Sequence, residues 1–299
     1  MEEQTTETKK TFSEFYNKNY KLFLIIPLVL LIFSLVYIGY FYSQNNDFIK
    51  KDVSLTGGTT ITIFSENINL EELKQALSQK TTDFSIRELS DFNTGKQQAV
   101  VIESPLDSAE LKSALEEILK YKLTEDNSSI EFSGSSLSSS FYKQLQIAIL
   151  FSFVLMAIVV FVIFRTPIVS GAVVLSAFAD ILMTIVTVNL LGIKVSSAGI
   201  VAFLMLIGYS VDTDIMLTTR LLKGRESSLN RQLFNSFKTG ITMTLTSIAA
   251  VGVALFFVYS FSETLSQIFT IMLIGLGFDI FNTWITNASI LKWYLERKK

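Results

Sequence analysis

The sequence predicts a polytopic α-helical membrane protein with six transmembrane helices and a ferredoxin-like α+β domain outside the membrane. The first observation is that the apolar residues, 49% of the chain, gather in long uncharged runs. The second is that one polar segment, residues 43–143, separates the first run from the other five. This segment carries the short periodic patterns of a folded domain.

The first predicted span covers residues 22–42. From Leu22 to Tyr42 there are 21 residues without a charge. At about 1.5 Å per residue such a helix is roughly 31 Å long, which matches a hydrocarbon core of about 30 Å. A cleaved signal peptide is the other interpretation. The length of the run and the lack of an A-x-A-like site after Tyr42 argue against it.

Five further spans are predicted within residues 144–291, at 144–164, 168–191, 196–218, 239–261 and 265–291. Lysine and arginine predict the orientation, because they are enriched in cytoplasmic segments. An inside N-terminus places the following residues inside: Lys9, Lys10, Lys18, Lys21, Arg165, Arg220, Lys223, Arg225, Arg231, Lys238, Lys292, Arg297, Lys298 and Lys299. The two short outer loops then hold only Lys194. We therefore expect a multi-pass cell-membrane protein whose tails, residues 1–21 and 292–299, are both cytoplasmic.

The outer segment, residues 43–143, is net acidic, with 16 acidic and 10 basic residues. Strands are predicted at 53–63, interrupted by Gly57-Gly58, then at 84–89 and 99–102 with a turn at 93–95, and around 130–132. Asn69 and Asp107 each precede an apolar helical stripe and are predicted to cap a helix. The order β-α-β-β-α-β is typical of a ferredoxin-like domain. Residues 133–140 are serine-rich and are expected to form a linker that lets the domain move.

Composition also excludes several classes of function. The chain has no cysteine and no histidine, which excludes disulfides and thiolate metal sites and leaves proton chemistry to carboxylates, lysine or tyrosine. The net charge of −2 argues against a nucleic-acid partner. The outer domain shows no catalytic cluster and is expected to be a contact module. We predict no enzyme activity, no cofactor and no metal.

Four aspartates fall inside the predicted spans: Asp180, Asp212, Asp214 and Asp279. Each charge at a span centre costs roughly 2.5–3.5 kcal/mol. One interpretation is an ion or proton pathway, in which Arg220 partners Asp212 or Asp214. The other is a set of protonated aspartates that hydrogen-bond neighbouring helices. Residues two apart on a helix face nearly opposite sides, so Asp212 and Asp214 are expected to have different roles.

Two motifs resemble those of a known family. Thr56-Gly57-Gly58-Thr59 follows the first span and resembles the TGGT signature of the SecD/SecF protein-export membrane proteins. The stretch from Ile207 to Lys223, with Asp212-Thr213-Asp214 and Arg220, resembles the fourth-span motif of the SecF branch in its archaeal form. Bacterial members have Asn-Asp-Thr in place of Asp212-Thr213-Asp214. The layout of one span, a domain and five spans covers nearly the whole chain.

The resemblance implies half of a unit of the resistance-nodulation-division (RND) superfamily. Such a chain would act with a SecD-like partner beside the Sec translocation channel and assist exported polypeptides on the outer side. Movement coupled to a proton or sodium gradient, as in bacterial relatives, would assign an ion-coupling role to Asp212 and Arg220.

Two other functions remain open. An RND-type lipid or small-molecule exporter is expected to be a self-sufficient twelve-span chain or a homodimer, whereas this chain supplies only one half. An intramembrane aspartyl protease would need two aspartates in a dyad. Gly275-Leu276-Gly277-Phe278-Asp279 comes near the GxGD signature of such proteases but has one residue too many.

Overall fold

A computed structural model gives the architecture of the chain. It describes all residues except 1–18, 82–83, 92–93, 225–227, 260–261 and 299. Of the basic residues used above for orientation, Lys9, Lys10, Lys18, Arg225 and Lys299 lie outside the described residues, as does Asn93 of the predicted turn. The described residues include six helical segments long and apolar enough to cross a membrane. The six predicted spans are confirmed.

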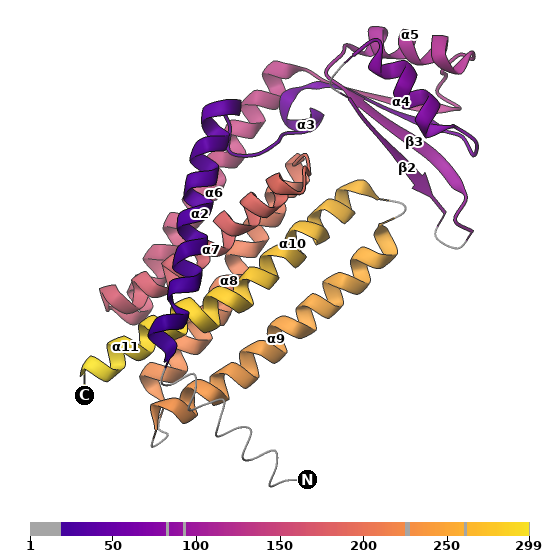
Figure 1. Cartoon of the computed structure of the whole chain (residues 1–299). Helices are drawn as coiled ribbons and strands as arrows, with labels where there is room; N and C mark the ends of the chain where they lie inside the picture. Colours follow the sequence, from indigo (N-terminus) through magenta and orange to yellow (C-terminus); the bar gives the residue numbers. More distant parts are fainter. Residues whose placement is uncertain (1–18, 82–83, 92–93, 225–227, 260–261, 299) are drawn as a thin grey trace.

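The helices form one bundle, and the α+β domain, called the head below, lies at one end of it (Figure 1). The helix bounds are α2 (Ile25–Asn45), α6 (Ser135–Phe164), α7 (Pro167–Leu190), α8 (Ser197–Lys223), α9 (Leu229–Val258) and α10 (Glu263–Phe281), which continues through a π-helix, η1 (Asn282–Asn287), into α11 (Ala288–Lys298). The last described residues lie at the end of the bundle opposite the head (Figure 1).

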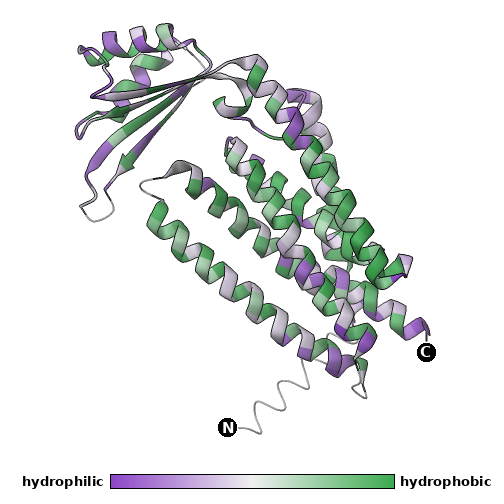
Figure 2. Ribbon diagram, turned by 180° about the vertical axis from the view of Figure 1, so that it is seen from behind, coloured by the Kyte–Doolittle hydropathy of each residue, from purple (hydrophilic) through white to green (hydrophobic). Residues whose placement is uncertain are grey.

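Helices α7 and α8 form the centre of the bundle. Fifteen of the 24 residues of α7 and 13 of the 27 residues of α8 are buried, and both helices pack against α10. Helices α2, α6 and α9 instead expose most of their apolar side chains, as expected of surfaces that face lipid or a partner chain. Figure 2 shows polar patches that interrupt the otherwise apolar helices within the bundle.

The head contains a four-stranded antiparallel sheet of β1 (Gly58–Phe64), β2 (Ser85–Ser90), β3 (Gln97–Ser104) and β4 (Ser128–Ser133). The strand order is β2-β3-β1-β4, so the predicted ferredoxin-like topology is confirmed. Helices α4 (Leu70–Ser78) and α5 (Ser108–Leu119) cover one face. Asn69 and Asp107 cap them through side-chain oxygens, as predicted. The core between helices and sheet includes Ile61, Ile102 and Leu115.

Two local predictions were wrong. Residues Val53–Thr56 form a short helix, α3, rather than a strand. The Asp52 carboxylate accepts a hydrogen bond from the Ser54 backbone N–H and caps this turn, which overrides the period-two apolar pattern. The serine-rich segment is also no linker, because α6 begins at Ser135 and runs without a break to Phe164. The serine hydroxyls of its first turns bond within the segment, as between Ser133 and Ser138.

Candidate functional site

A layer of polar side chains lies between α7, α8 and the α10–η1 helix. Asp180 on α7 is fully buried. Its Oδ1 accepts a 2.7 Å hydrogen bond from the Asn282 amide, and its Oδ2 accepts one of 2.6 Å from the Ser210 hydroxyl. Both carboxylate oxygens therefore have a donor, and one aspartate connects three helices.

Asp214 on α8 and Asp279 on α10 are also fully buried, but they are less well satisfied. Asp214 Oδ1 accepts from the Asn287 amide at 2.7 Å and from the Thr283 hydroxyl at 2.9 Å. The same hydroxyl lies 3.2 Å from Asp279 Oδ1. A hydroxyl has one proton to donate, so the two aspartates compete for it. The second oxygen of each carboxylate has no hydrogen-bond partner.

The π-helical turn η1 supplies most of these donors. Its residues Asn282, Thr283, Thr286 and Asn287 are all buried and polar. A π-helix has a wider turn than an α-helix and is common at functional sites. The wide turn allows Asn282 to reach Asp180 while Asn287, five residues later, reaches Asp214. The sequence analysis identified the aspartates but missed Thr283, Asn287 and Ser210 as their hydrogen-bond partners.

The remaining predicted residues lie outside this layer. Asp212 is exposed, while Asp214 is buried, so the prediction that the two face different sides is confirmed. Arg220 donates a 2.8 Å hydrogen bond to the Thr239 hydroxyl on α9. Among the described residues, no ion pair joins Arg220 to Asp212 or Asp214. The structure thus groups Asp180, Asp214 and Asp279, and leaves Asp212 and Arg220 apart.

A second polar network joins the head to the outer ends of the helices. The Val195 backbone bonds with Lys50 and Asp52, and the Ser197 N–H donates to the Ser54 hydroxyl at 3.0 Å. On α10, Gln267 donates to the Lys194 carbonyl at 2.6 Å and accepts from the Ser196 N–H at 2.9 Å. The α7–α8 loop is thereby held by the base of the head and by the helix that carries Asp279.

The motif Thr56-Gly57-Gly58-Thr59 forms the joint between this base and the sheet. Gly57 has a φ of +87°, and a Cβ there would lie 2.4 Å from the Ser135 backbone. Gly58 has a φ of +143°, and its Cβ would lie 2.4 Å from the Ser104 carbonyl oxygen. Thr59 donates to the Leu106 carbonyl at 2.7 Å. Only glycine allows the chain that enters the head at residues 57–58 to pass this close to the backbone at Ser104 and Ser135.

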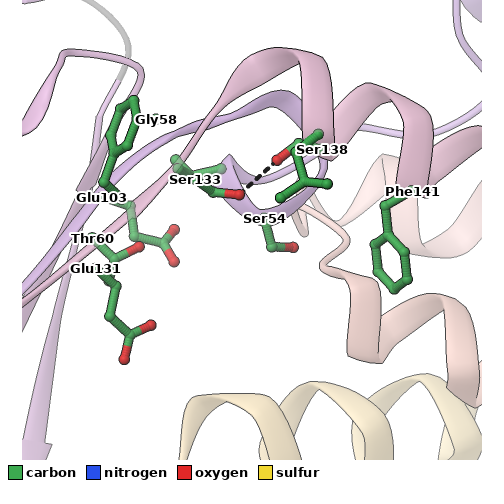
Figure 3. Close-up of a pocket in the computed structure, with 11 residues that line it drawn as sticks. Ser54, Gly58, Thr60, Glu103, Glu131, Ser133, Ser138 and Phe141 are labelled. Atoms are coloured by element: carbon green, nitrogen blue, oxygen red, sulfur yellow. Dashed lines mark hydrogen bonds between the residues drawn. The ribbon is translucent and has the colours of Figure 1, made fainter.

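A cleft of about 500 Å³ lies between the open face of the sheet and the start of α6 (Figure 3). Carboxylates of Glu103 and Glu131, several hydroxyls and Phe141 line it. Burial raises the pKa of Glu103, and the nearby Asp52 carboxylate raises it further, while Arg87 lowers it. Burial likewise raises the pKa of Asp52, against its hydrogen bonds from Ser54. Of the carboxylates that line the cleft, Glu103 therefore holds its proton more strongly than usual.

Known proteins resemble this chain over most of its length. The family model "Protein export membrane protein SecD/SecF, C-terminal" matches residues 113–297. The protein-export membrane protein SecF of Methanocaldococcus jannaschii is 40% identical, with 93% of this chain and 96% of that protein covered. The SecF proteins of Pyrococcus furiosus and Methanothermobacter thermautotrophicus are 34% and 35% identical, with 93% of this chain and 92% and 94% of those proteins covered.

The fold is similar to that of solved structures of SecDF, a translocon-associated membrane protein. The structure from Thermus thermophilus has a TM-score of 0.71 at 18% identity and covers 94% of this chain. A super-membrane-facing form has a TM-score of 0.54 and covers 91%. This chain spans 38% of the length of each SecDF chain. With its fold, its motifs and its relatives in agreement, this chain belongs to the SecD/SecF family of protein-export membrane proteins.

Proposed function

We propose that this chain is an auxiliary subunit of the Sec protein-export machinery that assists the translocation or release of secreted proteins. The observation that carries the proposal is the 40% identity to a SecF protein over 96% of that protein's length. The architecture supports it, because a folded head at one end of a membrane bundle can contact a polypeptide as it leaves the channel. We assign residues 43–143 to the extracytoplasmic side and both termini to the cytoplasm.

A SecD-like membrane protein is the proposed partner. The chain spans only 38% of the SecDF structure that it resembles, and so corresponds to part of a larger assembly. Helices α2, α6 and α9 expose large apolar side chains such as Val36, Leu150 and Phe256. Lipid can cover these surfaces, and so can the helices of a second membrane subunit.

We further propose that an ion gradient drives the head through the carboxylate layer. Asp214 and Asp279 each keep an unsatisfied buried oxygen, which makes them the centre of the proposed pathway, with Asp180 as their neighbour. One charge crossing 100 mV yields about 2.3 kcal/mol, enough to bias an element between two positions. Helix α10 carries Asp279 in the layer and Gln267 at the head base, so it can transmit a shift. Asp212, which is exposed, and Arg220, which bonds to Thr239 instead, lie outside this proposed pathway.

The first test is to tag the chain at its C-terminus in its native cells, solubilise the membranes gently and identify the proteins that copurify. Recovery of a SecD-like protein, with or without channel subunits, is the expected result. A homo-oligomer without any Sec component would contradict the proposal and favour an exporter of small molecules or lipids. A matched tagged membrane protein of unrelated function controls for non-specific recovery.

A further inference from the structure

Strand β4 lies at one edge of the sheet in the head and pairs on one side only, with β1. Natural edge strands are usually protected from further pairing by a bulge, a proline or a lysine. The sequence of β4 is Ser-Ser-Ile-Glu-Phe-Ser, and its register with β1 is regular over the whole strand. Residues 129–132 are all exposed. This edge therefore lacks all three protections.

One hydrogen bond shows which backbone groups of β4 point away from the sheet. The Phe64 N–H donates to the Asn127 carbonyl at 2.9 Å, which continues the register of the β1–β4 pair. Successive residues of a strand direct their backbone groups to opposite sides, so residues 129, 131 and 133 also bond towards β1. The N–H and C=O groups of Ile130 and Phe132 then point to the free edge. Within the described residues, these outward groups have no backbone partner.

A row of side chains crosses the open face of the sheet beside this edge. Thr60 pairs with Glu103 on β3 and with Glu131 on β4, so the three lie side by side (Figure 3). A strand added at the free edge would place one side chain next to Glu131, with about 4.5–5.5 Å between the Cβ atoms. Glu103 has Arg87 at 3.9 Å, whereas no ion pair in the described part of the chain includes Glu131. The position beside Glu131 therefore favours a lysine or an arginine.

The cleft next to this row adds apolar contacts. Phe132, Leu137 and Phe141 line it and are 61%, 71% and 44% exposed. None of the described residues that line the cleft is basic. Its volume of about 500 Å³ lies in the range of ligand sites, and exposed apolar side chains beside such a cleft are typical of an interaction surface. The cleft thus suits an occupant that carries both positive charge and apolar side chains.

We propose that an exported polypeptide, in extended conformation, adds a strand to the free edge of β4 and places a lysine or arginine beside Glu131. The inference rests on the proposed function and names the surface of the head that receives the polypeptide. Strand addition uses main-chain hydrogen bonds, which nearly every sequence can form, and side chains then set the preference. This mode of binding suits a protein that handles many different secreted sequences.

The lining of the cleft favours a transient occupant over a permanent strand from a partner subunit. Ser54, Thr60, Ser133 and Ser138 contribute hydroxyl groups to it, and two glutamates contribute carboxylates. Permanent interfaces are more apolar and are depleted in charge at their centre. A polar cleft with an apolar border is typical of a contact that forms and breaks.

The binding test uses the full-length chain in phosphatidylcholine nanodiscs, with whatever partner copurifies. The probes are short fluorescein-labelled peptides that alternate valine with lysine or valine with glutamate. Fluorescence anisotropy measures their binding, and empty nanodiscs give the background. The lysine peptide should bind about tenfold more tightly than the glutamate peptide. Equal binding of the two peptides, or no binding because a partner strand already occupies the edge, would overturn the proposal. Either failure would leave the copurification test of the export role unaffected.

Ile130→Pro tests the strand addition itself. Proline removes the outward N–H of residue 130 but no hydrogen bond to β1, so the sheet should stay folded while peptide binding weakens by at least about tenfold. The matched control is Ile130→Val, which keeps the N–H and should bind as the parent does. Thermal unfolding checks the fold of both variants. Peptide binding that survives Ile130→Pro in the folded protein would overturn strand addition at this edge.

Glu131→Lys tests the charge preference at an exposed position. The variant should bind the glutamate peptide more tightly than the lysine peptide, because the cross-strand pair beside residue 131 changes sign. A purely structural role of Glu131 would not exchange the two preferences. Glu66→Lys is the control, since Glu66 is exposed, lies outside the cleft lining and gives the same change in net charge. An unchanged preference in Glu131→Lys, or the same reversal in Glu66→Lys, would overturn the assignment of Glu131.

Discussion

The Asn282 amide donates a 2.7 Å hydrogen bond to Asp180 Oδ1 and thereby joins the π-helical turn to α7. The Ser210 hydroxyl donates to Asp180 Oδ2, so both carboxylate oxygens of Asp180 have a donor and the side chain is held in place. Asp214 and Asp279 have only one satisfied oxygen each. The three aspartates are thus unequal, because only Asp180 has a hydrogen-bond donor on both carboxylate oxygens.

Asn282→Ala should destabilise the protein by about 1–3 kcal/mol, because it leaves a buried carboxylate oxygen without its donor. Unfolding by SDS titration in detergent micelles measures the loss. The control is Thr242→Ala, which removes an exposed hydroxyl that bonds only to its own helix. If the two variants unfold alike, Asn282 does not stabilise Asp180.

Gly57→Ala should impair the joint of the head, because the added Cβ would meet the Ser135 backbone at 2.4 Å. Gly95→Ala is the matched control, since Gly95 also has a positive φ, of +65°, but has nothing within 4 Å of the added atom. The control should cost about 1–2 kcal/mol for the backbone conformation alone. The rate at which protease cleaves the head in isolated membranes is measured for both the Gly57→Ala and the Gly95→Ala variant. Equal protection would show that the close crossing at Ser135 is not required.

Gln267→Met should free the α7–α8 loop from α10, since methionine keeps the volume of glutamine but cannot bond Lys194 and Ser196. We expect faster amide hydrogen exchange at residues 191–197, by about tenfold for each 1.4 kcal/mol of lost stabilisation. Gln79→Met, an exposed position in the head, is the control. Unchanged exchange at the loop would exclude Gln267 as a link between the layer and the head base.

Glu103→Gln tests the acidic cleft. Burial raises the pKa of Glu103 above its usual value of 4.5, so the folded state holds the proton more tightly than the unfolded state. The free energy of unfolding therefore falls as pH rises from the unfolded pKa through the folded one. Glu103→Gln should remove this fall and be more stable than the parent at neutral pH. The measurement is the free energy of unfolding of the parent and the variant between pH 4 and pH 7. Glu131→Gln, at an exposed position, is the control. If Glu103→Gln leaves the pH dependence of the free energy of unfolding unchanged, Glu103 is not its cause.

Most of the architecture was predictable because it depends on patterns that a sequence displays directly. Uncharged runs identify the spans, and the caps at Asn69 and Asp107 identify the head helices. Residues 53–56 were mispredicted because a short period-two pattern does not reveal a local cap such as Asp52. The serine-rich start of α6 was mispredicted because composition suggested a linker, whereas these serines form the first turns of a helix whose first residue, Ser135, lies close to Gly57.

The site was only partly predictable. Charged residues within apolar runs identified Asp180, Asp214 and Asp279, because their desolvation cost makes them conspicuous. Their partners are neutral, and several lie on a π-helix, whose register an α-helical reading places wrongly. Asn287 therefore had no signal of its own. The available hint was that polar residues recur every four positions after Asp279, at Thr283 and Asn287.

We propose that the buried carboxylates of the polar layer, rather than the exposed Asp212 nearby, support export. The most direct measurement is a pulse–chase assay of secreted precursors in cells whose native copy is replaced by Asp214→Asn or Asp212→Asn, with protein amounts checked by immunoblot. We predict at least about tenfold slower maturation with Asp214→Asn and near-normal maturation with Asp212→Asn, since only Asp214 lies in the polar layer. Normal maturation with stable Asp214→Asn protein would contradict the proposal that Asp214 supports export.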